Sequence, residues 1–115
     1  MPSLLCHHNA TLSAEASQAF AHTLCRETAS LLGKPPAYML ATVQQADAMS
    51  MDTNAEPAAV FHLEGLSLTA DKVGPVVERL TALCTEHLRT APSRVHIIAA
   101  DIPRTHWGFD GKPMA

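Results

Sequence analysis

The N-terminal third of the chain contains a short apolar segment followed by a long amphipathic one. Residues 2–8 are typical of a strand. Ser13 is a good helix N-cap, and Glu15 would lie in the first turn, where the helix dipole favours an acidic side chain. The core positions of this helix then follow at helical spacing, with one polar lapse: Ala16, Phe20, Leu24, Glu27 or Thr28, and Leu31.

Glycine and proline separate this helix from the next strand. Gly33 is suited to the helix C-cap, and Pro35 and Pro36 prevent the helix from restarting. Residues 37–44 are rich in β-forming side chains and are bounded by turn signals, so a strand is predicted there. The polar segment 45–57 is predicted to be a loop, with a short strand inside it as the alternative.

The second half of the chain repeats this order. Strands are predicted over 58–64 and over 94–100. Between them, a helix is predicted from Thr69 or Asp71 to about Leu88. Its apolar stripe has helical spacing and consists of Val73, Val76, Val77, Leu80, Leu83, Cys84 and Leu88.

Each half therefore contains a strand, a helix, a proline-containing turn and a second strand. Pro36 in the first half corresponds to Pro92 in the second. Two consecutive βαβ units with right-handed crossovers predict an α+β fold. We expect a single domain over residues 1–115, with a four-stranded mixed sheet and two helices on one face.

The predicted sheet has more apolar surface than two helices can cover. Each strand carries adjacent apolar residues, which point to opposite faces of a sheet. These pairs are Leu4-Leu5, Met39-Leu40, Val60-Phe61 and Ile97-Ile98. We therefore expect another copy of the chain to cover the second face, which makes the protein an obligate homo-oligomer.

Composition and charge narrow the class of protein. The chain has 115 residues, of which 47% are hydrophobic and 17% charged, as is typical of a globular protein. Its net charge of −3 argues against nucleic-acid binding. No apolar run approaches the roughly 20 residues that cross a bilayer. No signal peptide is readable, so a cytoplasmic location is expected, with secretion by another route left open.

Histidine and cysteine spacing indicates no metal site. His7 and His8 are neighbours on a predicted strand and point to opposite faces, and His-x-x-x-His and Cys-x-x-Cys spacings are absent. From their strand positions alone, His62 and His96 are interpreted as structural. The remaining candidates for metal or redox chemistry are interpreted as buried thiols in a reducing compartment: Cys6, Cys25 and Cys84.

Aromatic residues make up only 4% of the chain, and two of the five lie close together near the C-terminus. These are Trp107 and Phe109. Their late position predicts a pocket wall or a subunit contact, with ordinary packing of a C-terminal strand as the alternative.

Pro2 is the residue best suited to general-base chemistry. Removal of Met1 would leave it with a secondary amine at the chain end. Such an amine has a pKa of about 8, which burial or a nearby cation lowers toward neutrality. Lys34, which follows the helix C-cap, is a candidate cation. Taken alone, a lysine at this position is also explained as a solvated charge favoured by the helix dipole.

Short motifs are spread over the whole chain in a specific order. They are Pro2 and Asn9, Gly33-Lys34-Pro35-Pro36-x-Tyr38, Glu56-Pro57-Ala58, Leu88-Arg89-Thr90-Ala91-Pro92-Ser93-Arg94-Val95, Asp101, and Trp107-Gly108-Phe109. In these motifs the chain resembles the macrophage migration inhibitory factor family of the tautomerase superfamily.

The resemblance implies a homotrimer with a site at each subunit interface. It implies cofactor-free keto–enol tautomerisation of phenylpyruvate-like α-keto acids, and of dopachrome-like substrates. Pro2 matches the catalytic base, and Lys34 matches the lysine that binds the substrate carboxylate. Leu66 falls where a backbone amide contacts substrate. The positions that line the aromatic pocket are occupied by Tyr38, Trp107 and Phe109.

The chain also departs from the pattern of the family. His96 replaces a tyrosine and Ile98 an asparagine of mammalian-type members, at positions that reach the pocket from a neighbouring subunit. The loss of the asparagine removes a hydrogen-bonding group, whereas His96 either donates one or is structural. Trp107 replaces a smaller aliphatic residue, which narrows the pocket. Ala58 and Phe61 replace the Cys-x-x-Cys of some members, so no thiol-redox activity is expected.

Three functions are compatible with these residues. A tautomerase is favoured by the joint presence of Pro2 and Lys34. A binding or signalling protein would keep the trimer with only vestigial activity. A hydrolytic dehalogenase or decarboxylase would generally need an added arginine and an acidic water activator near the proline. Arg104 and Asp101 are the candidates for those roles, and both are interpreted as structural.

Overall fold

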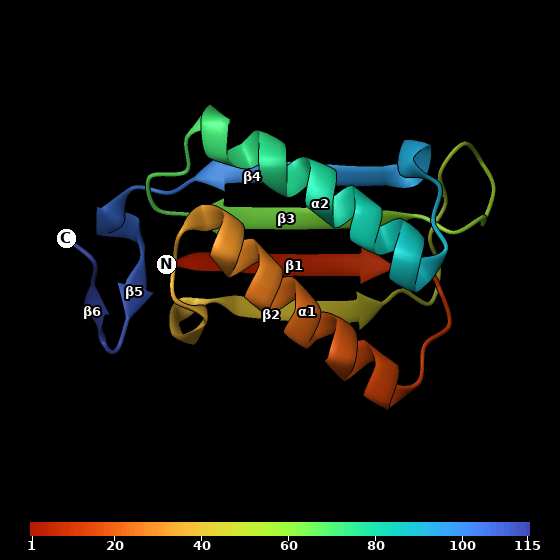
Figure 1. Ribbon diagram of the computed structural model, residues 1–115, viewed down its shortest axis with the longest axis horizontal. Helices are drawn as coiled ribbons and strands as arrows, with labels where there is room; N and C mark the ends of the chain where they lie inside the picture. The colour runs from red at the N-terminus through yellow and green to blue at the C-terminus, as the bar shows by residue number, and fades with distance from the viewer.

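The computed structural model describes residues 1–115 and shows one sheet with two helices on one of its faces (Figure 1). The sheet has the strand order β2-β1-β3-β4. Its strands are β1 (Pro2–His8), β2 (Leu40–Gln45), β3 (Ala59–Gly65) and β4 (Val95–Asp101). The helices are α1 (Ala14–Leu32) and α2 (Ala70–Leu88).

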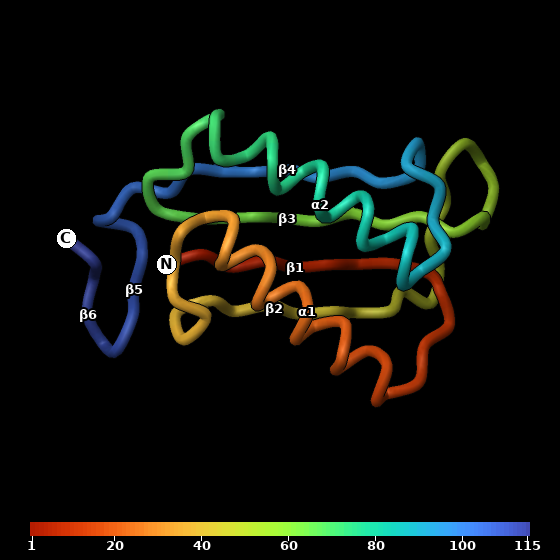
Figure 2. The backbone as a smooth tube through the Cα atoms, viewed as in Figure 1, coloured from red at the N-terminus to blue at the C-terminus, as the bar shows by residue number.

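Two strand–helix–strand units build this sheet, as the sequence predicts. β1 pairs in parallel with β2, and β3 pairs in parallel with β4. The two units join through the antiparallel pairing of β1 with β3 at the centre of the sheet. The path of the chain through both units can be followed in Figure 2.

Local chemistry sets the ends of the helices. The Ser13 hydroxyl accepts a hydrogen bond from the Ala16 amide at 3.0 Å, which caps α1. Gly33 follows α1 with a φ of 67°, a left-handed conformation that glycine adopts without steric cost. α2 follows Thr69 and ends before Arg89. All of these boundaries agree with the predicted ones.

The prediction of a strand over 37–44 is wrong at its start. Pro36–Tyr38 form a short 3₁₀ helix, and β2 begins only at Leu40. Pro92–Arg94 form the matching turn before β4. In both turns the proline stands first, where its fixed φ suits a helical turn and overrides the β-forming residues that follow. The other two predicted strands, 58–64 and 94–100, are each shifted by one residue.

Two core positions of α1 are also predicted wrongly, because Ala16 in the first turn is exposed and Leu31 near the end is exposed as well. Leu31 is 41% exposed, and Leu32 is buried in its place. The buried residue Thr28 precedes these leucines by three and four positions, and both spacings return to the same face of a helix. Only the packing against the sheet decides between them.

The interpretation of all three cysteines as buried thiols is correct for Cys6 and Cys84. Burial raises the pKa of Cys84 to about 12 and raises the pKa of Cys6 as well. Cys25, in the middle of α1, is only partly buried. Its thiol donates to the Met39 carbonyl at 3.6 Å.

Two residues of the sequence motifs hold the loop between β2 and β3. The Asn9 side chain donates to two carbonyls and accepts from one amide within residues 55–58. The Arg94 guanidinium donates to three carbonyls within residues 51–57, at distances of 3.0 to 3.2 Å. Asn9 and Arg94 therefore have structural roles, because they satisfy backbone groups of a segment without regular structure.

A small C-terminal hairpin, absent from the sequence prediction, lies beyond the sheet at the end where β1 begins (Figure 1). It consists of β5 (Gly108–Phe109) and β6 (Lys112–Pro113). The Phe109 ring meets the Tyr38 ring edge-on, with centroids 5.7 Å apart and planes at 84°. This packing joins the hairpin to the turn before β2.

The two faces of the sheet differ in their covering. Leu4, Phe61 and Ile97 point toward the helices, and their neighbours Leu5, Val60 and Ile98 point to the open face. Leu40 and Ile98 are 65% and 54% exposed on that face. The prediction of an apolar second face is only partly correct, because polar side chains share it. They include His7, His62, His96 and Glu64.

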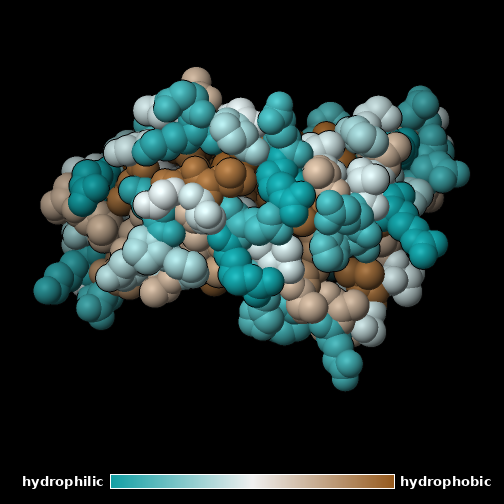
Figure 3. All heavy atoms as spheres, in the orientation of Figure 1, coloured by the Kyte–Doolittle hydropathy of each residue, from teal (hydrophilic) through white to brown (hydrophobic).

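The helix side of the molecule is mainly hydrophilic (Figure 3). Arg79 of α2 and Glu27 of α1 form an ion pair across the two helices, with Nε and Oε1 2.5 Å apart. Neither helix is long and apolar enough to cross a membrane.

One histidine is buried in the core between sheet and helices. His8 is 0% exposed, and its Nδ1 accepts a hydrogen bond from the Ala10 amide at 3.0 Å. Its Nε2 has no partner. A proton on Nδ1 would break the bond to Ala10 and leave a buried charge without a partner. Burial accordingly lowers the pKa of His8 below its usual value.

This histidine is expected to make the fold sensitive to acid. The unfolded chain takes up the His8 proton near its ordinary pKa of about 6.5, whereas the folded chain resists it. Stability should therefore fall as the pH drops below that value, by up to about 1.4 kcal/mol per pH unit from this group. Urea unfolding at fixed protein concentration between pH 7 and 5 would show a flatter dependence for His8→Gln. Equal slopes would contradict this role, because all other histidines are common to both proteins.

Candidate functional site

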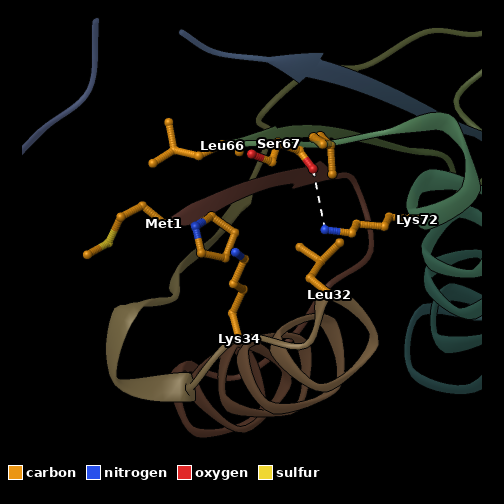
Figure 4. A pocket seen from close by; sticks show the side chains of 9 residues that line it. Met1, Leu32, Lys34, Leu66, Ser67 and Lys72 are labelled. Carbon is orange, nitrogen blue, oxygen red and sulfur yellow. Dashed lines mark hydrogen bonds between the residues drawn. The ribbon is translucent and has the colours of Figure 1, made fainter. Parts of the chain in front are cut away.

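A small pocket lies where the chain begins (Figure 4). Four parts of the structure meet there: the start of β1, the end of α1, the turn after β3 and the first turn of α2. The pocket is lined by Met1, Pro2, Leu32, Lys34, Gly65, Leu66, Ser67, Leu68 and Lys72.

The sheet register brings these elements together. Pro2 pairs with Gly65 in the antiparallel ladder, so the start of β1 lies beside the end of β3. α1 runs back along the sheet and ends at Gly33. The Lys34 amide donates to the Ala29 carbonyl at 2.9 Å, which fixes the chain as it leaves the helix. Lys34 extends from the end of α1 toward Met1 (Figure 4), and both residues line the pocket together with Pro2.

A tight turn after β3 forms the opposite wall. Ser67 adopts a φ of 54°, and the Leu68 amide donates to Oδ1 of Asp101 at 3.0 Å. The Ile102 amide donates to the Gly65 carbonyl at 2.8 Å, which ties the end of β4 to the same turn. Asp101 therefore holds the segment that carries Leu66. This backbone contact agrees with the interpretation of Asp101 as a structural residue, in preference to a water activator.

The pocket is electrostatically positive. Both Lys34 and Lys72 line it, no acidic residue does, and neither lysine forms an ion pair. Burial, then Lys34, then Arg104 lower the pKa of the terminal amine of Met1 below its usual value. The chain end thus lies in surroundings that favour a neutral amine.

Met1 determines which atom carries that amine. With Met1 attached, the nitrogen of Pro2 is part of a peptide bond and has no basic lone pair. Pro2 itself is buried at the first position of β1. Removal of Met1 would transfer the free amine to Pro2, beside Lys34.

The structure brings together only some of the predicted site residues. Pro2, Lys34 and Leu66 line one pocket. Tyr38 and Phe109 contact each other near this end of the molecule but do not line it. Trp107 is partly buried in a separate groove, which Ser3 and Glu64 also line.

His96 and Ile98 lie on the open face of the sheet, away from the pocket of their own subunit. Their placement is compatible with a contribution to a neighbouring copy, which stays a prediction. His96 lies beside Val60, and Ile98 lies beside His62.

Neither Ser67 nor Lys72 belongs to a sequence motif that predicts a place in the site. Both follow β3 closely in the chain, and β3 ends beside Pro2. The signal that could have found them is topological. Once β1 and β3 are paired antiparallel, residues just after β3 must lie next to the N-terminus.

Comparison with known proteins agrees with this architecture. The sequence profile described as "Macrophage migration inhibitory factor (MIF)" matches residues 1–115. A structure of a homologue of this factor from Prochlorococcus marinus is similar, with a TM-score of 0.91 and 22% identity over 98% of this chain and 99% of the other. The factor from Toxoplasma gondii gives a TM-score of 0.89 and 17% identity over 96% and 98% of the two chains.

A third similar structure is that of the protein Pt0534 inactivated by 2-oxo-3-pentynoate. It has a TM-score of 0.86 and 16% identity over 97% of this chain and 96% of the other. At these identities the three structures establish a shared fold.

Asp101 is expected to act on the pocket through the turn that it holds. Asp101→Ala removes the acceptor for the Leu68 amide and should lower the free energy of unfolding by about 1 kcal/mol. The Leu68 amide should exchange with solvent faster. Asp101→Asn retains an oxygen acceptor and should preserve most of the protection. Unchanged exchange in the alanine variant, measured by NMR, would show that the turn does not depend on this contact.

Proposed function

Because this chain belongs to the macrophage migration inhibitory factor family, we propose that it is a cofactor-independent keto–enol tautomerase. The proposed substrates are phenylpyruvate-like α-keto acids, and Pro2 is the proposed general base. One observation carries this proposal: Pro2 begins the chain's first strand and lines a positive pocket together with Lys34.

The proposed base forms when Met1 is removed. The amine would then belong to Pro2, with an ordinary pKa of about 8. The surroundings that lower the pKa of the present terminal amine, namely burial and the nearby cations Lys34 and Arg104, would act on it as well. A neutral amine at neutral pH is suited to remove a proton from carbon.

The reaction moves one proton between carbon and oxygen. Pro2 takes a proton from the carbon next to the keto group, and the negative charge that develops on the keto oxygen is stabilised by the positive pocket. Pro2 then gives the proton to that oxygen, which completes the enol and leaves the Pro2 amine neutral again. Lys34 binds the substrate carboxylate, and the backbone amide of Leu66 contacts the substrate. The name of the compound that inactivates Pt0534 denotes a 2-oxo acid, the same chemical class.

We further propose that the site is completed in a homotrimer. The open sheet face, with its exposed Leu40 and Ile98, supports association with further copies. In that assembly, His96 and Ile98 of one subunit would reach the pocket of another. The aromatic wall would come from Tyr38, Trp107 and Phe109.

The base is tested with protein whose mass confirms the loss of Met1. Such protein should catalyse phenylpyruvate tautomerisation, and Pro2→Gly should lose activity by at least roughly 100-fold. The same chain with Met1 retained is the matched control, and it should be inactive because its proline nitrogen is an amide. The acid limb of the pH profile of kcat/KM should lie below about 8, since the amine must be neutral to act.

Inactive processed protein would refute phenylpyruvate as a substrate. It would favour the binding or signalling role that shares this fold. Equal activity with and without Met1 would instead exclude Pro2 as the base.

Assembly through the open sheet face is tested by light scattering. The native protein should have three times the mass of one chain. Ile98→Lys places a charge on the open face and should shift the protein toward monomer, because an unpaired charge in an apolar contact is costly. Leu31→Lys is the matched control, since Leu31 is an exposed leucine on α1. A trimer that tolerates Ile98→Lys would place the subunit contact elsewhere.

A further inference from the structure

Lys72 is a second cation in the pocket, and the proposed reaction assigns it no contact of its own with the substrate. It lies in the first turn of α2, and its Nζ donates to the Ser67 carbonyl at 3.4 Å. Its side chain enters the pocket from the side opposite Met1, whereas Lys34 extends from the end of α1 (Figure 4). Lys72 thus comes from a different element and has no role in the local fold beyond one long hydrogen bond.

No carboxylate forms an ion pair with this second cation. Asp71, its neighbour in the chain, is exposed and accepts a hydrogen bond from the Thr69 hydroxyl. Asp101 accepts from the Leu68 amide, and Glu64 points to the open face of the sheet. Neither Lys72 nor Lys34 forms an ion pair.

Both lysines line the same pocket, so an anion that binds between them is attracted by both. One carboxylate on Lys34 would leave the ammonium group of Lys72 without a partner. A ligand with two carboxylates would match both lysines.

We propose that Lys72 is a specificity-determining residue and that the preferred substrates are 2-oxo dicarboxylic acids. The carboxylate beside the keto group binds Lys34, and the distal carboxylate binds Lys72. This inference rests on the proposed tautomerase function. The reaction is unchanged: the proton leaves the carbon next to the keto group, Pro2 accepts it, and no oxidant or reductant takes part.

Matched ligand pairs isolate the distal carboxylate. Oxaloacetate, 2-oxoglutarate and 2-oxoadipate each have a monoacid of equal chain length: 2-oxobutanoate, 2-oxopentanoate and 2-oxohexanoate. Binding to processed protein is measured by calorimetry, which does not depend on turnover. Exchange of the C3 protons with deuterated water is followed by NMR as the measure of catalysis.

At least one diacid is expected to bind the wild-type protein roughly tenfold more tightly than its monoacid. A factor of this size is what one charge-assisted hydrogen bond to the distal carboxylate contributes. Lys72→Met should abolish this preference, because it weakens diacid binding far more than monoacid binding. Lys72→Arg should retain part of it. Arg26→Met is the control for loss of one positive charge, because Arg26 is exposed on α1, outside the pocket.

The possible failures are distinguishable. Equal binding of diacids and monoacids by the wild-type protein, including no measurable binding of either, overturns the role of Lys72. Equal weakening of both ligands by Lys72→Met also overturns it, since Lys72 would then act only on the shared carboxylate. A diacid preference without any proton exchange would instead refute the tautomerase function and leave a diacid-binding site.

Discussion

The antiparallel pairing of β1 with β3 is the contact on which the rest of the molecule depends. It joins two βαβ units that would otherwise be separate, and it puts Pro2 opposite Gly65. Because β1 is an inner strand, its first residue has a neighbouring strand on each side. Pro2 therefore lies in the middle of one end of the sheet and not at a corner. The end of α1 and the start of α2 converge on the same end. The chain terminus is thereby surrounded by Lys34, Lys72 and a tight turn.

Much of this fold could be predicted because it follows from local chemistry. Ser13, Gly33 and the prolines mark the ends of elements, and apolar spacing identifies both helices. Predictions fail where two local solutions compete, as at Leu31 and Leu32, or where a proline turn replaces the start of a strand. The C-terminal hairpin is held by the contact between Phe109 and Tyr38, which are distant in sequence. No local pattern reports such a contact.

The motif residues fall into two groups that the sequence alone does not separate. Asn9 and Arg94 hold a loop by hydrogen bonds to its backbone, and Pro36 and Pro92 shape equivalent turns. Pro2 and Lys34 instead lie in the pocket. The sequence alone does not indicate that Lys72 lies in the pocket, because its place there follows from the pairing of β1 with β3 and from no motif. Most of the motif residues therefore shape the fold. Only a few of them, such as Pro2 and Lys34, line the pocket.

The location of Pro2 has a practical consequence for handling the protein. Because β1 begins at this residue and the pocket surrounds it, any N-terminal extension must leave through the pocket itself. An affinity tag, a fusion partner or an acetyl group at the amino end would occupy part of the pocket that Pro2 and Lys34 line. The C-terminus offers a safer attachment point, since Met114 is held only by one backbone hydrogen bond to Trp107. Recombinant protein intended for functional work should therefore carry its modifications at the carboxyl end.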